Sequence, residues 1–120
     1  MATLGTGIGG GIVLNGKIYN GFNSAGGEFG HSVFVHNGLP CTCGNKGCWE
    51  VYASVTALIA QTKEAMDKNP ESLMHKLSED AGKVSGRTAF DAAKAGDKKI
   101  ETYLYLARMS FDKDNNIVDE

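Results

Sequence analysis

The sequence predicts a mixed α/β chain in α+β order, with strands and tight turns in the first half and helices in the second. Thirteen of its 16 glycines precede Trp49, which is typical of a segment with many turns. From Trp49 onward, apolar residues recur at spacings of three and four, the period of a helix. We therefore divide the 120 residues into strands and loops over 1–48, helices over 49–111 and a polar tail over 112–120, which we expect to hold no structured element.

The first half contains two predicted strand regions. The segments 8–14 and 17–19 flank Asn15-Gly16, a pair that readily takes the two positive φ angles of a type I′ turn, so we expect a β-hairpin there. A further strand is expected over 32–35, and it ends at the turn signal His36-Asn37-Gly38.

The first predicted helix runs from Trp49 to about Lys68. It is indicated by six residues that share one face: Val51, Val55, Leu58, Ile59, Thr62 and Met66. The pair Asn69-Pro70 is expected to end this helix and to cap a second helix over 71–79.

Two more helices are predicted downstream. One spans 85–95 and is closed by Gly96, since glycine readily takes the left-handed conformation that ends a helix. Asp97 is expected to cap the last helix. The apolar face of that helix is formed by Ile100, Leu104, Ala107 and Phe111.

Composition and charge exclude several classes of function. The formal net charge is −2, and no cluster of Lys and Arg is dense enough to neutralise several phosphates of a duplex, so we expect no nucleic-acid partner. No apolar run is long enough to cross a membrane, and no basic N-terminus precedes one as in a secretory signal. We expect a cytoplasmic protein whose cysteines act as thiolates or metal ligands rather than in disulfides.

Three cysteines lie within eight residues: Cys41, Cys43 and Cys48. Gly44 and Gly47 allow the loop to fold back, so that the three sulfurs can meet at one point. A closed tetrahedral zinc site needs a fourth ligand, and His31 and His36 both lie upstream. A Cys3His set favours structural zinc over an iron–sulfur cluster. The alternative, cysteines that only fill a core beside Trp49, fits poorly with the polar residues of this loop.

A glycine-rich loop near the N-terminus has a different character: Gly5, Thr6, Gly7, Ile8, Gly9, Gly10 and Gly11. Residues without side chains let backbone N–H groups surround an anion, and the Thr6 hydroxyl adds a donor. No Gly-Lys-Ser/Thr follows, as a Walker A loop requires, and a hairpin follows where a dinucleotide-binding loop begins a helix. A glycine-rich strand edge that only needs close packing would have the same sequence. The residues alone therefore do not decide between an anion-binding loop and a packed strand edge.

Together these segments resemble the ROK family of bacterial repressors and sugar kinases. The resemblance rests on the glycine loop, the hairpin and two motifs: Gly26-Gly27-Glu28-Phe29-Gly30-His31, and Cys-x-Cys-Gly-x-x-Gly-Cys-Trp-Glu over 41–50. It is dense over 4–54 and looser as far as Asp97. The family is similar to actin and hexokinase in fold, with two RNase H-like lobes. The resemblance implies that this chain is an internal part of the C-terminal lobe.

The resemblance also implies roles for individual residues. The glycine loop over 5–11 resembles the phosphate motif that faces the β- and γ-phosphates of ATP, which binds with magnesium. Glu28 and Glu50 resemble carboxylates that accept hydrogen bonds from the hydroxyls of a hexose. His31 resembles the zinc ligand that also lies against the sugar, which selects it over His36 as the partner of the three cysteines.

The leading interpretation is a fragment of an ATP-dependent hexose kinase of glucokinase type. The alternative is the sugar-sensing effector domain of a ROK-family transcriptional repressor, and a free-standing zinc module that binds a protein is a third hypothesis. The intact glycine loop favours the kinase, because a sensor needs no phosphate cradle. The family's catalytic Asp and adenosine-binding segments are expected outside these residues. We therefore assign no catalytic residue and expect the chain alone to be inactive.

We also expect a homo-oligomer. The apolar faces of the first and last predicted helices must be covered, since each large apolar side chain left in water costs about 1.5–3 kcal/mol. The edge of the predicted hairpin is also open to a strand from a neighbouring copy.

Overall fold

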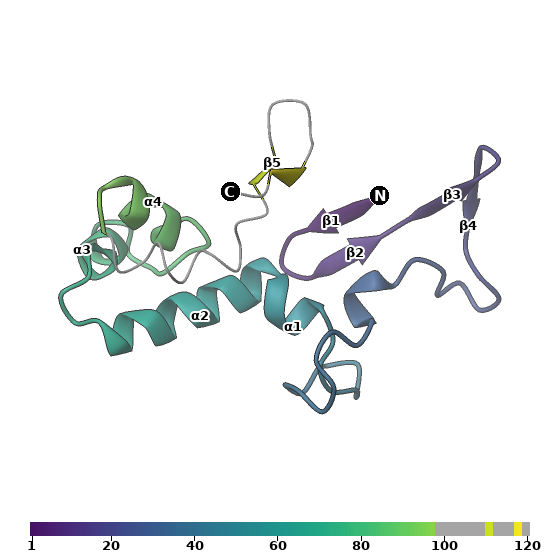
Figure 1. The fold of residues 1–120 in the computed structure, drawn as a ribbon, viewed down its shortest axis with the longest axis horizontal. Helices are drawn as coiled ribbons and strands as arrows, with labels where there is room; N and C mark the ends of the chain where they lie inside the picture. Colours follow the sequence, from purple (N-terminus) through teal and green to yellow (C-terminus); the bar gives the residue numbers. More distant parts are fainter. Residues whose placement is uncertain (98–109, 112–116, 119–120) are drawn as a thin grey trace. The chain divides into compact units, whose positions relative to one another are not determined.

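The computed structural model describes residues 1–97, 110–111 and 117–118 (Figure 1). The chain divides into two compact units, Met1–Ala60 and Gln61–Glu120. The predicted order is confirmed for the first 97 residues, where short antiparallel hairpins precede helices. No helix among the described residues is long and apolar enough to cross a membrane.

Two hairpins follow one another at the start of the first unit, drawn in purple in Figure 1. Strand β1 (Ala2–Leu4) pairs with β2 (Ile8–Gly10), so residues 5–7 of the glycine loop form the turn and its later residues enter β2. Strand β3 (Ile12–Leu14) pairs with β4 (Lys17–Tyr19) around Asn15-Gly16, whose φ angles are 49° and 75° as the predicted turn requires. The hairpin prediction is confirmed, but 8–14 is not one strand, because its two halves pair with different partners.

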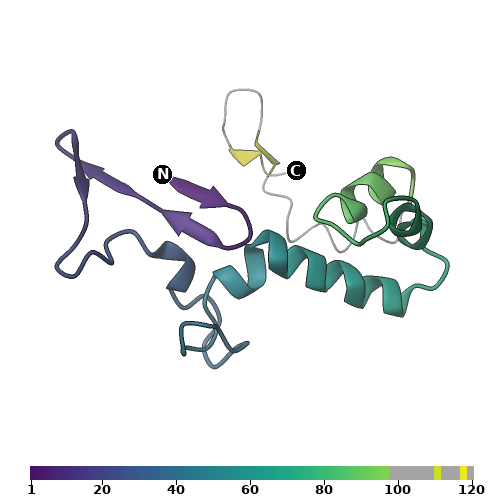
Figure 2. The same ribbon diagram turned by 180° about the vertical axis from the view of Figure 1, so that it is seen from behind.

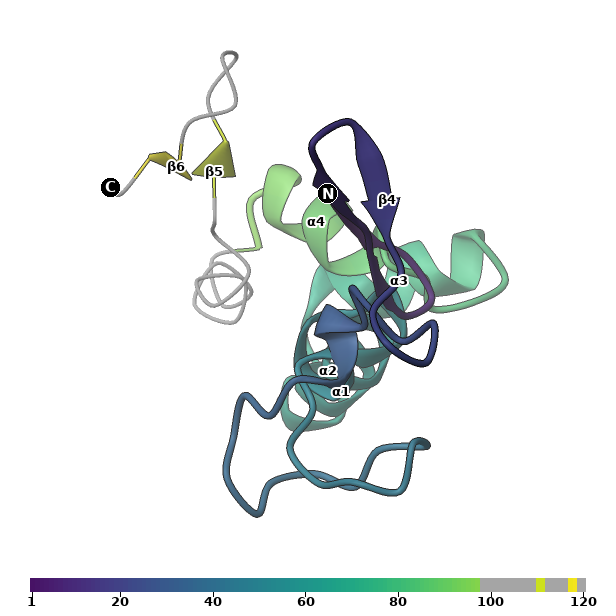
Figure 3. The same ribbon diagram turned by 90° about the vertical axis from the view of Figure 1, so that its right-hand side faces the viewer.

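A short 3-10 helix, η1 (Phe29–His31), lies beside β2 in the first unit (Figure 3). A Cβ atom at Gly30 would collide with the Ile8 carbonyl oxygen and lie only 3.0 Å from the Ile8 Cβ atom. The absence of a side chain at Gly30 therefore lets η1 pack against Ile8, whose side chain is buried. This contact places the residues of η1 next to the strand that leaves the glycine loop.

The strand expected over 32–35 does not form. Val33 makes only an isolated bridge to Cys48, and the Gly47 carbonyl accepts hydrogen bonds from both Phe34 and Val35. Because one carbonyl takes two consecutive N–H groups, the alternating pattern of a ladder is lost at this point. These backbone contacts nevertheless hold residues 33–35 beside Gly47 and Cys48.

The single helix expected from Trp49 to Lys68 is broken into α1 (Glu50–Ala53) and α2 (Val55–Lys68). The break falls at Ser54, which is extended, with ψ at 166°, and whose buried Oγ accepts a hydrogen bond from the Ala57 N–H at 3.1 Å. Ser54 therefore acts as the N-cap of α2. The first N–H of α2, from Val55, has no partner within the helix and donates instead to the Gly5 carbonyl at 2.8 Å.

The second unit packs two short helices around a small core. Helices α3 (Leu73–Asp80) and α4 (Thr88–Lys94) lie side by side, in green in Figure 2. The buried side chains of the core are Ala65, Met66, Met74, Ala89 and Ala92. Helix α4 begins three residues later than predicted, and Gly96, with φ at 93°, follows its end as expected.

Helix α3 is capped by residues other than those predicted. Its N-cap is Ser72, whose Oγ accepts a hydrogen bond from the Met74 N–H. Asp97 supports this cap, since its carboxylate accepts hydrogen bonds from the Ser72 hydroxyl at 2.6 Å and from the Leu73 N–H at 2.9 Å. Asn69 serves the preceding helix, because its side-chain amide donates to the Ala65 carbonyl.

The last predicted helix lies mostly outside the described residues, which leave out Ile100, Leu104 and Ala107. Phe111 is described, and there the helix prediction is wrong, because Ser110–Phe111 form strand β5, paired with β6 (Ile117–Val118). The expectation of a tail without structure is wrong at 117–118 for the same reason. The polar residues 112–116 between two short apolar segments are a hairpin signal that the helical spacing concealed.

The predicted hairpin β3–β4 exposes several apolar side chains to solvent. Val13 and Ile18 are 65% and 75% exposed in this chain, and Phe22, three residues after the hairpin, is 106% exposed. The expected homo-oligomer is not tested by a single chain and stays a prediction.

We predict that Asp97→Ala destabilises the second unit, because α3 loses an acceptor at its N-terminus and the Ser72 hydroxyl loses its partner. The expected loss is about 0.5–2 kcal/mol, the usual cost of removing a helix cap. Urea unfolding followed by circular dichroism measures it. Asp97→Asn keeps one acceptor oxygen and should lose less, and an unchanged midpoint for Asp97→Ala would contradict the capping role.

Candidate metal centre

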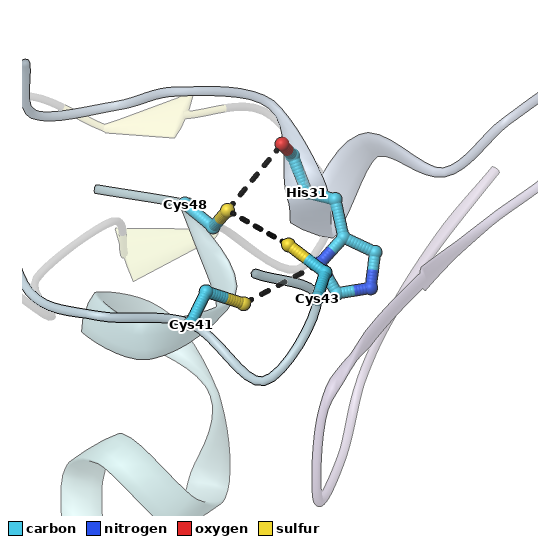
Figure 4. Close-up of side chains that lie close together, drawn as sticks. All are labelled: His31, Cys41, Cys43 and Cys48. Carbon is cyan, nitrogen blue, oxygen red and sulfur yellow. Dashed lines mark hydrogen bonds between the residues drawn. The ribbon is translucent and has the colours of Figure 1, made fainter. Parts of the chain in front are cut away.

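Four side chains meet in the first unit: His31, Cys41, Cys43 and Cys48. Their candidate ligand atoms all lie within 4.8 Å of one another, and Figure 4 shows the side chains pointing toward a common centre. The sequence predicted the three cysteines, and the resemblance selected His31. The structure brings His31 to the sulfurs, whereas His36 is exposed and does not belong to this cluster.

The loop that carries the cysteines is closed by backbone hydrogen bonds. The Cys41 N–H donates to the Asn45 carbonyl at 2.9 Å, and the Gly47 N–H donates to the Leu39 carbonyl at 2.7 Å. Gly44 and Gly47 have φ angles of 92° and 77°, so both take the left-handed conformation that lets the loop fold back, as predicted.

Two contacts fix this loop to its surroundings in the first unit. The Trp49 N–H donates to the Ser32 carbonyl at 2.9 Å, which brings the returning chain beside His31. The hydroxyl of Tyr52, on α1, accepts a hydrogen bond from the Leu39 N–H at 2.7 Å, and the Tyr52 ring lies 6.0 Å from that of Phe34. The role of Tyr52 is not predictable from the sequence, because a tyrosine in a helical pattern gives no sign of a distant partner.

The distances within the cluster fit a tetrahedral zinc ion. Zinc binds sulfur at about 2.3 Å and imidazole nitrogen at about 2.0 Å, so tetrahedral ligands lie about 3.8 Å apart for two sulfurs and about 3.5 Å for sulfur and nitrogen. The Cys43 and Cys48 sulfurs are 3.6 Å apart, and the Cys41 sulfur lies 3.6 Å from Nδ1 of His31 (Figure 4). The donor set and its spacing therefore suit the predicted ion.

The cysteines of the cluster differ in acidity. A hydrogen bond from the Cys43 backbone lowers the pKa of the Cys41 thiol to about 7, and the neighbouring thiols and His31 act in the same direction while burial opposes them. Burial raises the pKa of the Cys48 thiol to about 12, and the other two cysteines add to this effect. Metal ligands must be thiolates, so binding of a cation displaces the proton that Cys48 otherwise keeps.

The two glutamates expected to bind sugar have different environments. Glu28 is exposed at the start of η1, and its carboxylate makes no hydrogen bond with any described residue. Glu50 is half-buried at the start of α1, and its Oε2 accepts a hydrogen bond from the Ile8 N–H at 2.8 Å. Glu50 therefore lies against the glycine loop, while the Glu28 carboxylate is open to a ligand.

The glycine loop uses some of its backbone donors internally. The Gly5 N–H donates to the Gly7 carbonyl, and the Gly11 N–H donates to the Met1 carbonyl, each at 2.9 Å. Among the described residues, no group accepts a hydrogen bond from the N–H of Thr6 or Gly7. At the turn of the glycine loop, two adjacent N–H groups are therefore open to a ligand, and the anion-binding role of 5–11 stays a prediction.

The chain is of mixed α/β class and carries a candidate metal site, and its elements match part of an actin-like ATPase fold. A ROK family glucokinase from Streptomyces griseus, in complex with glucose and AMPPNP, aligns with a TM-score of 0.75 at 38% identity, over 89% of this chain and 36% of that one. Residues 1–109 match the model of the ROK family. The chain belongs to the ROK family.

Curated relatives include both kinases and repressors. The glucokinase of Thermotoga maritima is 44% identical over 96 residues, which cover 80% of this chain and 30% of that enzyme. The xylose repressor of Bacillus spizizenii is 49% identical over 65 residues, which cover 52% of this chain and 17% of that protein. The chain thus spans about a third or less of the length of the relatives it matches.

We predict that His31→Ala weakens zinc binding more than tenfold, because even the loss of a partner outside the ligand shell costs about 10–100-fold in metal affinity. The matched control is His36→Ala, which removes the histidine outside the cluster. Elemental analysis and competition with a chromophoric chelator measure both. A wild-type chain that takes up no zinc on reconstitution, or equal losses in the two variants, would contradict the assignment.

Proposed function

We propose that this chain supplies the phosphate loop, part of the sugar site and a structural zinc centre of an ATP-dependent hexose kinase of glucokinase type. The observation that carries the proposal is the glycine loop. Its Thr6 and Gly7 N–H groups have no acceptor among the described residues, while the Ile8 N–H is held by Glu50. Two adjacent free donors on a turn are suited to a phosphate group.

The sugar side of the proposal rests on three polar side chains around η1 and α1. Glu28 presents an open carboxylate, which can accept hydrogen bonds from two sugar hydroxyls. His31 directs Nδ1 toward Cys41, and its second ring nitrogen points away from the cysteines (Figure 4). A His31 that binds zinc through Nδ1 keeps Nε2–H as a donor to a hydroxyl.

The zinc centre has a structural role in this proposal. Four protein ligands leave no open position for water, so the ion supplies rigidity rather than Lewis acidity. Its ligands begin three residues after Glu28 and end two residues before Glu50, and it therefore fixes the segment between the two glutamates. We assign no catalytic base within the chain. In kinases of this kind, alignment and charge stabilisation of the transferred phosphoryl group provide most of the catalysis.

A sugar-sensing role in a repressor is the second candidate. It is supported by the 49% identity to the Bacillus spizizenii xylose repressor, although that match covers only 52% of this chain. The two candidates share the sugar and zinc residues and differ in the need for a nucleotide. A phosphate-binding loop with free donors favours the kinase.

We propose a chimera in which the matching residues of this chain replace the 96-residue segment of the Thermotoga maritima glucokinase that aligns with them. We predict that this chimera still phosphorylates glucose. In this chimera, Glu28→Gln should lower kcat/KM for glucose by about 10–100-fold, the effect of weakening a charged hydrogen bond. A coupled assay with ATP and magnesium measures both. Asp67→Asn, an exposed carboxylate on α2, is the matched control and should change little.

Zinc content and the melting temperature of the chimera show whether it has folded. A folded, zinc-loaded chimera that binds glucose but neither binds AMPPNP nor phosphorylates the sugar would reject the kinase and favour the sensor. A Glu28→Gln variant as active as its parent would reject the proposed sugar contact.

A further inference from the structure

The carboxylate of Glu50 joins two segments that are 42 residues apart in the sequence. Its Oε2 accepts the Ile8 N–H at 2.8 Å in a partly buried position. Ile8 begins β2, immediately after the turn that presents the free N–H groups of Thr6 and Gly7. Glu50 therefore holds the loop at the residue that follows its open donors.

Gly7 shows how closely the carboxylate approaches the loop. A Cβ atom at Gly7 would overlap Oε2 of Glu50 and would lie 3.0 Å from the Glu50 carboxyl carbon. Gly7 has no positive φ, so its backbone conformation is open to alanine. A side chain at Gly7 would therefore force the Glu50 carboxylate to move away from its present position.

Two further hydrogen bonds come from the start of α2. The Val55 N–H donates to the Gly5 carbonyl at 2.8 Å, and the Thr56 hydroxyl donates to the Thr6 carbonyl at 2.7 Å. The Gly5 carbonyl and the Thr6 N–H belong to one planar peptide unit, and the Thr6 carbonyl and the Gly7 N–H belong to the next. The two hydrogen bonds from α2 therefore hold the same peptide units that carry the free N–H groups. A negatively charged carboxylate repels a phosphate, so Glu50 cannot itself be a phosphate ligand.

We propose that Glu50 is a positioning residue for the glycine loop. It fixes the loop through Oε2, while Oε1 is left for a sugar hydroxyl, so that one carboxylate joins the hexose site to the phosphate loop. The link to phosphate rests on the proposed function, whereas the positioning of the loop by Glu50 does not depend on it.

Amide hydrogen exchange of the zinc-loaded chain, followed residue by residue by NMR, tests the proposal. Glu50→Ala should raise the exchange rate of the Ile8 N–H by about tenfold or more, because the loss of a hydrogen bond to a charged group exposes this amide. Glu50→Gln keeps a carbonyl acceptor of the same length and should restore most of the protection. The amides of α3 serve as the internal reference, and zinc content shows that each variant has folded.

A double-mutant cycle separates positioning from general destabilisation. Gly7→Ala should displace the carboxylate and raise Ile8 exchange when Glu50 is present, but should add less than about twofold on top of Glu50→Ala, because the two changes remove the same contact. Ile8 exchange within twofold of wild type in Glu50→Ala would overturn the proposal. So would additive effects of the two substitutions, or a rise spread equally over the whole first unit.

The outcomes of the two proposals can be told apart. If Ile8 exchange is unchanged in Glu50→Ala, the positioning role of Glu50 is rejected. The proposed kinase function is not affected by that result. A chimera without kinase activity rejects the proposed function, while the exchange rates at Ile8 still decide whether Glu50 holds the loop.

Discussion

Three thiols and one imidazole lie so close together that their candidate ligand atoms are all within 4.8 Å of one another. The fold of the first unit depends on this close approach. The segment from His31 to Cys48 must close on itself for the donors to meet. It does so through left-handed turns at Gly44 and Gly47 and a bridge between Val33 and Cys48. Closure sets where Glu28 and Glu50 lie, because they precede and follow the closed segment by a few residues.

The cysteine cluster is connected to the glycine loop through the two residues after Cys48 and one hydrogen bond. Cys48 is fully buried, and α1 starts two residues later with Glu50, whose carboxylate holds the Ile8 N–H. The break at Ser54 then frees the N–H of Val55 for the Gly5 carbonyl. We infer that a metal bound by this cluster would influence the glycine loop even with its coordination closed, because it would order the start of the helix that contacts the loop.

The three cysteines of the candidate site were predictable because their spacing is local and their chemistry is specific, whereas only the family resemblance selected His31 over His36. The Asn15-Gly16 turn was predictable for the same reason. The break at Ser54 was not, since the apolar residues on either side keep a helical period. The break is favoured by the Ser54 cap and by the tertiary contact of Val55 with Gly5. The bond between Glu50 and Ile8 spans 42 residues and leaves no local signal, and the pairing of 110–111 with 117–118 was hidden by helical spacing that ended at Phe111.

The central claim is that the metal centre orders both the segment from His31 to Glu50 and, through Glu50, the glycine loop. Amide hydrogen exchange measured on the zinc-loaded and the chelator-stripped chain tests it most directly. The account predicts that stripping zinc raises exchange at Cys41, Trp49 and Ile8 together, while the amides of α3 keep their rates. Loss of protection at Cys41 and Trp49 with Ile8 unchanged, or no change at any of the three, would contradict it.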